Sequence, residues 1–311
     1  MALYLVTGAA GFIGAALAAS LLREGHEVVG ADNLSTGFMQ NVPAGVQFFH
    51  GDCGEAGLYN GVLPARPYDA VFHIAGQSSG EISFDDPVYD LRSNTVSVLH
   101  LLRFALDNGC RRFIYAGSMS VYGEQPDAPV REGAPCRPQS FYGVGKLASE
   151  HYLRLHEQYG MRSTSLRLFN VYGPGQNMIN MRQGMVSIFM SMMLADGHIH
   201  IKGRPDRYRD FVYIDDVVRA FTACLTRRES EGGILNIGGS GRVTVGELAD
   251  KITALSEKPV SVEYSGGTPG DVHGIYADIS LARERLGYVP QVSPEEGLAR
   301  MYAALKAGSA A

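Results

Sequence analysis

The chain has 311 residues and a formal net charge of −5 at pH 7. This length allows a large hydrophobic core in one extended domain or in two, and the charge balance gives no electrostatic reason to expect nucleic acid or an anionic membrane as a partner. The cysteines show neither metal-ligand spacing nor a disulfide framework, which favours a reducing compartment; they are Cys53, Cys110, Cys136 and Cys224.

The first 23 residues predict a strand, a tight turn and a helix. The apolar run Leu3–Val6 is typical of a buried strand, and the Ala- and Leu-rich stretch Phe12–Arg23 is typical of a helix. Between them, Gly8, Gly11 and Gly14 are three residues apart. Glycine lets the backbone approach a pyrophosphate there, at the positive end of the helix dipole.

The same region has no charged side chain from Ala2 to Leu22, which raises the alternative of a membrane span or signal peptide. It has no basic leader and no typical cleavage site, and its glycines sit where a strand-to-helix turn needs them. We therefore expect a soluble protein with no membrane partner.

The next predicted strand, His26–Asp32, ends on a carboxylate. An acid at this point can accept hydrogen bonds from the adenosine ribose, and it repels the extra phosphate of NADP. Because Asn33 and Leu34 supply no arginine to neutralise that phosphate, the pattern favours NAD.

Strands and helices then alternate. Further strands are predicted at residues 46–50, 69–75, 112–116 and 163–169, and helices at 88–108 and 142–159. The alternation predicts a doubly wound parallel sheet of the α/β class, covered by helices on both faces, with ligands at the carboxyl ends of its strands. Polar side chains expected at these ends are Asp52, His73, Ser118 and Asn170. Of these, His73 is interpreted as structural.

The segment from Ser140 to Lys146 carries the strongest chemical signal. Tyr142 and Lys146 are four residues apart, so on a helix they share a face. A nearby ammonium favours the phenolate, so we expect a tyrosine pKa below its usual value of about 10. Tyr-x-x-x-Lys alone is more often an ordinary amphipathic pair, and it gains weight here from the upstream glycine turn and Ser118.

These segments resemble the extended short-chain dehydrogenase/reductase family, and within it the NAD-dependent nucleotide-sugar epimerase/dehydratase group that is UDP-glucose 4-epimerase-like. The resemblance covers nearly the whole chain, and further matching segments are residues 32–37, 118–123, 167–175, 209–217 and 236–239. It implies a Rossmann domain for NAD at residues 1–170, which also receives later segments near 205–240. Residues 171–311 would form a smaller mixed α/β lobe for the nucleotide sugar.

The resemblance also implies roles for single residues. Ser118, Tyr142 and Lys146 would be catalytic, Arg209 would clamp the diphosphate, and residues 198–201 would form a short strand or hairpin over the base. The residues expected to bind NAD are Gly8, Gly11, Phe12, Ile13, Gly14, Asp32, Asn33, Ser35, Thr36, Gly37, Asp52, Cys53, Ala75, Gly76, Gln77, Asn94, Tyr142 and Lys146. Those expected to bind the nucleotide sugar are Ser78, Ser79, Ser118, Ser120, Asn170, Val186, His200, Arg209 and Asp271. No metal site is expected.

Two departures from the family pattern narrow the chemistry. Met119 and Ser120 stand where dehydratases carry an acid pair, and neither side chain is a general acid or base at neutral pH. Dehydration and decarboxylation are therefore disfavoured. Thr268 stands where many relatives carry a phosphate-binding arginine, which leaves the nucleotide open, and Pro269 to Asp271 are equally typical of a plain turn.

The resemblance thus implies NAD-dependent epimerisation of a nucleotide-activated sugar at C4 through a transient 4-keto sugar. Tyr142 would take the O4 proton while NAD takes the C4 hydride, which then returns to the opposite face. The alternatives are an NAD(P)H-dependent 4-ketoreductase, another nucleotide-sugar enzyme of the family, or a non-catalytic dinucleotide sensor. The resemblance further implies a cytoplasmic homodimer joined through a four-helix bundle, in carbohydrate metabolism such as polysaccharide biosynthesis.

Overall fold

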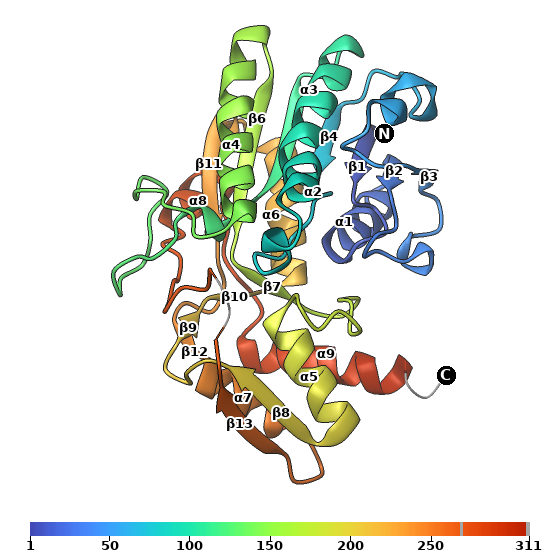
Figure 1. Cartoon of the computed structure of the whole chain (residues 1–311). Coiled ribbons are helices and arrows are strands. Elements are labelled where there is room, and N and C mark those ends of the chain that lie inside the picture. Colours follow the sequence, from blue (N-terminus) through green and yellow to red (C-terminus); the bar gives the residue numbers. More distant parts are fainter. Residues whose placement is uncertain (268–269, 309–311) are drawn as a thin grey trace.

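A seven-stranded parallel sheet forms the centre of the molecule in the computed structural model, which describes residues 1–267 and 270–308 (Figure 1). Its strand order is β11-β6-β5-β4-β1-β2-β3. The strands are β1 (Leu3–Thr7), β2 (Glu27–Asp32), β3 (Gln47–His50), β4 (Ala70–His73), β5 (Arg112–Ser118), β6 (Arg162–Leu168) and β11 (Gly233–Ile237). The predicted doubly wound α/β fold is confirmed.

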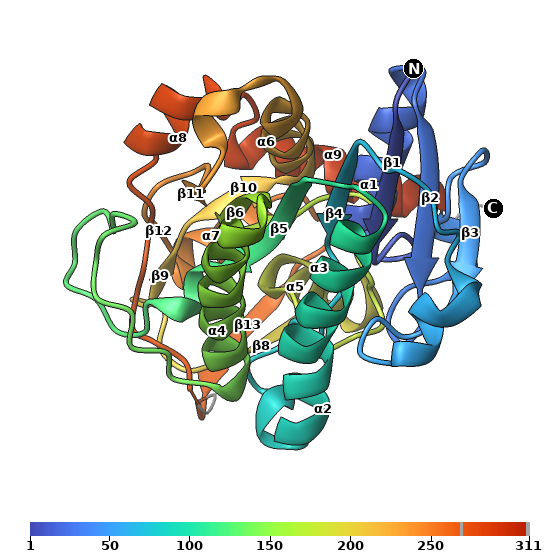
Figure 2. The same ribbon diagram turned by 90° about the horizontal axis from the view of Figure 1, so that it is seen from above.

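Helices cover both faces of this sheet (Figure 2). Helices α2 (Pro87–Leu91), α3 (Ser97–Asp107) and α4 (Phe141–His156) lie on one face, and a π-helical turn, η4 (Arg92–Val96), joins the first two. Helices α1 (Phe12–Arg23) and α6 (Ile214–Thr226) lie on the other face and contact each other. The helix predicted at residues 88–108 is therefore real but contains a wide turn.

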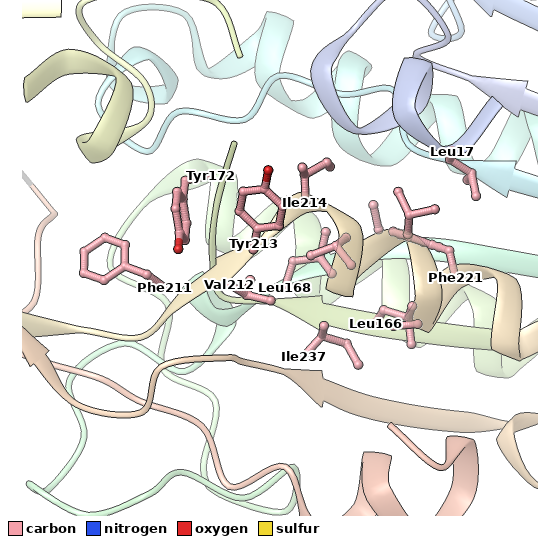
Figure 3. Close-up of a cluster of buried hydrophobic side chains, with 14 of the residues drawn as sticks. Leu17, Leu166, Leu168, Tyr172, Phe211, Val212, Tyr213, Ile214, Phe221 and Ile237 are labelled. Carbon is pink, nitrogen blue, oxygen red and sulfur yellow. The ribbon is translucent and has the colours of Figure 1, made fainter. Parts of the chain in front are cut away.

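Successive residues of each strand point to opposite faces of the sheet, and a hydrophobic core covers each face, which explains the long apolar runs. In β1, Leu5 packs into the core under α3 and α4, whereas Val6 packs into the core under α1 and α6. Val71 and Phe72 in β4 divide in the same way. Both sheet faces are buried, so neither face needs charged residues. Figure 3 shows the α6 side, where Phe221 lies between Leu17 of α1 and Leu166 of β6.

The uncharged stretch from Ala2 to Leu22 is accounted for by buried β1 and by α1. No helix within residues 1–267 and 270–308 is both long and apolar enough to cross a lipid bilayer.

The remaining strands and helices lie outside the sheet. Most of them form smaller units below it in Figure 1, whereas α8 (Ser280–Leu286) lies beside β11. The smaller units contain β7 (Asn170–Tyr172) with β10 (Phe211–Tyr213), β9 (Tyr208–Arg209) with β12 (Val243–Thr244), β8 (His198–Lys202) with β13 (Ser261–Ser265), and the helices α5 (Met185–Asp196), α7 (Val245–Thr253) and α9 (Pro294–Gly308). The predicted lobe boundary at residue 170 stays a prediction.

The strand expected at residues 198–201 is present as β8, but it does not form a hairpin. Its partner β13 runs parallel to it and lies beyond α7 in the sequence. Parallel neighbours need a long crossover connection, and the intervening segment supplies one.

A buried ion pair fixes α4 against the sheet. Glu150 of α4 and Arg167 of β6 are both almost fully buried, and Arg167 Nη2 lies 2.7 Å from Glu150 Oε2. Arg167 Nε donates to Glu150 Oε1 at 2.9 Å, and Ser165 Oγ donates to the same oxygen at 3.1 Å. The pair lies one turn beyond Lys146 and so holds the helix that carries Tyr142 and Lys146.

Removing one partner of this pair should destabilise the protein strongly. Arg167→Ala leaves the Glu150 carboxylate buried without its counter-ion, and we expect the free energy of unfolding to fall by about 3–5 kcal/mol in urea denaturation. The matched control is Arg103→Ala, which breaks the exposed pair with Asp107 and is expected to change stability by less than about 1 kcal/mol. Equal losses of unfolding free energy in the two variants would show that the buried ion pair contributes no more to stability than the exposed pair.

Candidate active site

Two adjoining cavities open at the carboxyl ends of the central strands. The first, here the glycine-turn cavity, follows β1, β2, β3 and β4; the second, the tyrosine cavity, follows β5 and β6. The residues that line both cavities are Phe12, Ile13, Ile74, Gly76, Ser78, Gln176 and Gln183. The two cavities therefore adjoin along a shared wall, at the switch point where a doubly wound sheet binds its ligands.

The glycine turn is shaped so that side chains cannot enter it. A Cβ on Gly14 would lie 2.0 Å from the carbonyl oxygen of Gly8, and a Cβ on Gly8, which has φ +73°, would lie 2.8 Å from Ala75 N. Helix α1 follows with no side-chain cap on Gly11. Its first-turn N–H groups, which lack helical acceptors, are thus available at the cavity for an anionic ligand.

Two carboxylates stand at the far end of the glycine-turn cavity. Asp32 accepts from Ala10 N at 3.0 Å and from Leu34 N at 2.7 Å, one bond to each oxygen. Asp52 accepts from Asn33 Nδ2 at 2.9 Å and from Gly54 N at 2.7 Å. Each oxygen keeps a free lone pair for a hydroxyl or amino donor. With the glycine turn, this donor and acceptor set fits the pyrophosphate and adenosine of a dinucleotide.

The tyrosine cavity brings Ser118, Tyr142 and Lys146 together. Ser118 is the last residue of β5, while Tyr142 and Lys146 come from α4, whose N-terminus is capped by a bond from Gly143 N to Ser140 Oγ of 3.1 Å. Lys146 Nζ donates to Ala116 O at 3.0 Å and lies 5.7 Å from the centroid of the Tyr142 ring. Ser118 Oγ donates to Ser120 Oγ at 3.1 Å, and Ser118 and Tyr142 line the same cavity.

Burial dominates the protonation of this cluster. It raises the pKa of Tyr142 to about 12, although the hydrogen bond with Ser118 opposes the rise. Burial also lowers the pKa of Lys146 to about 8, against the attraction of Asp90 and Glu150. The sequence-based prediction of a lowered tyrosine pKa is thus wrong for the protein without a ligand, because burial removes water from the phenol and the charge of Asp90 adds to the rise.

His73 behaves as the sequence predicted. Its ring is fully buried, with Nδ1 2.7 Å from Thr7 Oγ1 and Nε2 3.2 Å from Ser97 Oγ. Burial and then the Lys146 charge lower its pKa to about 3. The neutral imidazole of β4 therefore contacts Thr7 of β1 and Ser97 of α3.

Most residues expected to bind NAD line the glycine-turn cavity, and Tyr142 and Lys146 line the tyrosine cavity. Gly37, Gln77 and Asn94 line neither: Gly37 packs against Ala10, and the two amides lie behind Gly76. Their roles stay predictions.

The residues expected to bind the nucleotide sugar divide in two. Ser78, Ser118, Ser120, Asn170 and Val186 line the tyrosine cavity. Ser79, His200, Arg209 and Asp271 line neither cavity.

Arg209 is buried and ion-paired with Asp271, which also pairs with Arg207. Exposed His200 approaches Ser265 Oγ at 2.7 Å. Thr268 and Pro269 lie outside the described residues.

Sequence reasoning missed one segment, residues 175–184, which borders both cavities. Gln176 and Gln183 line both of them, and Asn177 Nδ2 donates to Thr36 O at 3.0 Å. At its other end Arg182 Nη1 lies 2.6 Å from Asp85 Oδ2. The only signal in the sequence was its content of amide side chains, but loop composition alone does not say which cavity a loop borders.

Comparisons with known proteins agree with this geometry. The family model described as "NAD dependent epimerase/dehydratase family" matches residues 4–238. The UDP-glucose 4-epimerase of Mycolicibacterium smegmatis is 36% identical over 303 residues, which cover 95% of this chain and 96% of that protein.

Two solved structures are similar over almost the whole chain. One is the UDP-glucose 4-epimerase of Thermotoga maritima with UDP-glucose, at a TM-score of 0.92 and 34% identity, covering 99% of both chains. The other is the UDP-glucose 4-epimerase of Thermus thermophilus in complex with NAD, at a TM-score of 0.90 and 32% identity, covering 98% of this chain and 99% of that one.

The closeness of Gly14 to Gly8 gives a direct test of the dinucleotide site. Gly14→Ala places a methyl group against the Gly8 carbonyl and forces the turn open, so we expect the affinity for NAD in calorimetric titration to fall at least about tenfold. Gly57→Ala is the matched control, because no described atom lies within 4 Å of its Cβ position and its φ is −60°. NAD affinity that survives the Gly14 change would contradict the assignment of this turn.

Proposed function

The chain belongs to the NAD dependent epimerase/dehydratase family and is an NAD-dependent nucleotide-sugar 4-epimerase, and we propose that its substrate is a UDP-hexose. The observation that supports this most is the meeting of Ser118, Tyr142 and Lys146 in a cavity that adjoins the glycine-turn cavity. UDP-glucose is the first candidate, because the relatives named above act on it or bind it.

We assign the proton chemistry to Tyr142. Its phenolate oxygen, beside Ser118 in the tyrosine cavity, takes the proton from the sugar O4 as the C4 hydride leaves. The resulting hydroxyl returns that proton to O4 when the hydride comes back to the opposite face of C4. Lys146 stabilises the phenolate by its charge. When bound, NAD supplies the hydride acceptor for C4, and its positive charge favours the phenolate as Lys146 does. The proton returns to the same oxygen, so the site needs no route to solvent.

The glycine turn would hold the NAD pyrophosphate, Asp32 the adenosine ribose, Asp52 the adenine, and Lys146 the nicotinamide ribose. Asn94 Oδ1 is a buried acceptor without a partner among the described residues, which fits a hydroxyl donor arriving from a ligand at Gly76.

The wall of the tyrosine cavity fits inversion of a sugar ring rather than loss of water. Within the described residues, its lining includes no aspartate, glutamate or histidine, so Tyr142 has no second acid to work with. Met119, Met185, Val186 and Phe211 form an apolar side. Such a surface allows a hexose to turn over while the nucleotide handle stays fixed.

Replacing the phenol tests this assignment. Tyr142→Phe should bind NAD as the wild type does, but conversion of UDP-glucose to UDP-galactose, followed by chromatography, should fall at least about a hundredfold because the O4 proton has no acceptor. Tyr159→Phe, at an exposed position, is the control that keeps full turnover.

Coenzyme balance separates the epimerase from a 4-ketoreductase that uses the same three residues. The epimerase interconverts the two sugars with no net change in reduced coenzyme. Stoichiometric consumption of NADH or NADPH without interconversion would contradict the proposal. Full turnover in Tyr142→Phe would refute the role of the phenol.

We also propose that the chain forms a homodimer through α2, α3 and α4. These helices lie side by side on one face of the sheet (Figures 1 and 2). They expose apolar side chains to solvent, namely Val88, Leu91, Phe141, Val144 and Leu155. Because η4 joins α2 to α3 without a break, each copy contributes two long helical segments. Two copies that pair these faces would build a four-helix bundle and bury this patch.

A charge at the centre of that patch should separate the dimer. Val144→Asp is expected to sediment as a monomer in analytical ultracentrifugation, because an aspartate cannot be buried in an apolar interface without a partner. Val289→Asp changes an equally exposed valine after α8 and should leave the dimer intact. A dimer that persists in Val144→Asp would exclude this face as the interface.

The cytoplasm is the compartment we propose, within carbohydrate metabolism such as polysaccharide biosynthesis. Cys53, Cys110, Cys136 and Cys224 are all free thiols. Three of these thiols are buried, so they contribute as small apolar side chains, which suits a reducing compartment.

A further inference from the structure

A buried carboxylate without an ion-pair partner among the described residues stands behind the catalytic groups. Asp90 of α2 is 1% exposed. Its Oδ1 accepts from Gln77 Nε2 at 2.8 Å and from Asn94 Nδ2 at 3.1 Å. Within the described part of the chain no lysine, arginine or histidine nitrogen lies within 4.0 Å of this carboxylate. Burial raises the pKa of Asp90, and the hydrogen bonds from Gln77 and Asn94 and the charge of Lys146 oppose that rise.

Asp90 sets the orientation of both amides. Asn94 Nδ2 also donates to Gln77 O at 2.9 Å, so both of its N–H groups are hydrogen-bonded. Its Oδ1 has no hydrogen-bond partner among the described residues. Gln77 Nε2 also donates to Ser79 O at 2.8 Å. The space above Gly76 lies between Asn94 and Lys146, since a Cβ there would be 2.5 Å from Asn94 Oδ1 and 3.5 Å from Lys146 Nζ. The amide oxygen and the lysine ammonium therefore both border the space above Gly76.

Titratable side chains from four elements, α4, β5, β4 and α2, surround Lys146. From α4, Tyr142 lies beside it and Glu150 lies one turn away; from β5, the Tyr115 ring centroid is 4.8 Å from Nζ. From β4, His73 is neutral. Glu150 is already matched by Arg167 at 2.7 Å, so Asp90 of α2 is the one of these two carboxylates without a partner.

We propose that Asp90 is a positioning residue for the epimerase reaction: its carboxylate is the buried counter-ion that keeps the Lys146 ammonium charged, and it holds the Asn94 carboxamide with Oδ1 toward the site. The proposal rests on the proposed function for its catalytic meaning. The effect of Asp90 on the charge of Lys146 does not depend on substrate or coenzyme, so it can be measured on the protein alone.

The sign of the effect follows from the charge. Asp90 raises the pKa of Lys146 against the lowering by burial, and it adds to the raised pKa of Tyr142. Replacing it with a neutral residue makes proton loss easier at both groups. The basic limb of the pH–rate profile, where Lys146 loses its proton, therefore moves to lower pH.

The test compares Asp90→Asn with the wild type over pH 5 to 10, with UDP-glucose as substrate. The asparagine keeps an Oδ1 acceptor for Gln77 and Asn94, so a purely structural role predicts an unmoved profile. Asp107→Asn is the matched control, because it removes the same charge from an exposed position on α3. Asp90→Ser is a second neutral variant that relieves any crowding against Gly145, whose Cβ position lies 3.5 Å from Asp90 Oδ2.

A second readout needs neither substrate nor coenzyme. Trace labelling of Lys146 with acetic anhydride, read by peptide mass spectrometry, should begin at lower pH in both Asp90 variants than in the wild type. An unmoved pH–rate profile together with unmoved labelling overturns the proposal. A wild type that fails to convert any UDP-hexose refutes the proposed function instead, and the labelling still decides the role of Asp90.

Discussion

The burial of one ammonium group is the constraint on which the site depends. Lys146 is 4% exposed, and an unpaired charge in such a place would lose its proton. Its surroundings oppose that loss: the Ala116 carbonyl, the rings of Tyr115 and Tyr142, and the carboxylates of Asp90 and Glu150. A charge that is costly to bury but held in place acts strongly on a phenol a few ångströms away, because little water screens it.

The fold delivers that charge to the right place. Helix α4 starts where Ser140 caps it, so Tyr142 and Lys146 come in its first two turns, at the carboxyl end of β5. Further along, Glu150 and Arg167 anchor the helix to β6. The glycine turn after β1 opens onto the same edge of the sheet. Two segments far apart in sequence therefore meet, because parallel strands present their ends together.

Much of this was predictable from the sequence, because it depends on local patterns. The span of α1, the glycine turn, and the shared face of Tyr142 and Lys146 follow from periodicity and spacing alone. What local patterns cannot supply is burial depth. The pKa of Tyr142 rises instead of falling because the surrounding layers remove water from its ring, and the five-residue motif Tyr-x-x-x-Lys does not report burial.

Contacts between residues far apart in the sequence were the other feature that the sequence did not predict. The parallel partner of β8 and the ion pairs of Asp271 with Arg207 and Arg209 join residues more than fifty positions apart. The segment 175–184 borders both cavities only because β7 and α5 place its two ends there. Composition marks it as a polar loop without saying what it covers.

The central claim is that the Tyr142 hydroxyl, beside the charged lysine, bonds the oxygen on the carbon that inverts. A crystal structure of the protein with NAD and UDP-glucose measures this directly. The account predicts that Tyr142 Oη lies within about 3.2 Å of the sugar O4. A sugar bound with O4 turned away, and Tyr142 bonded to Ser118 alone, would contradict it.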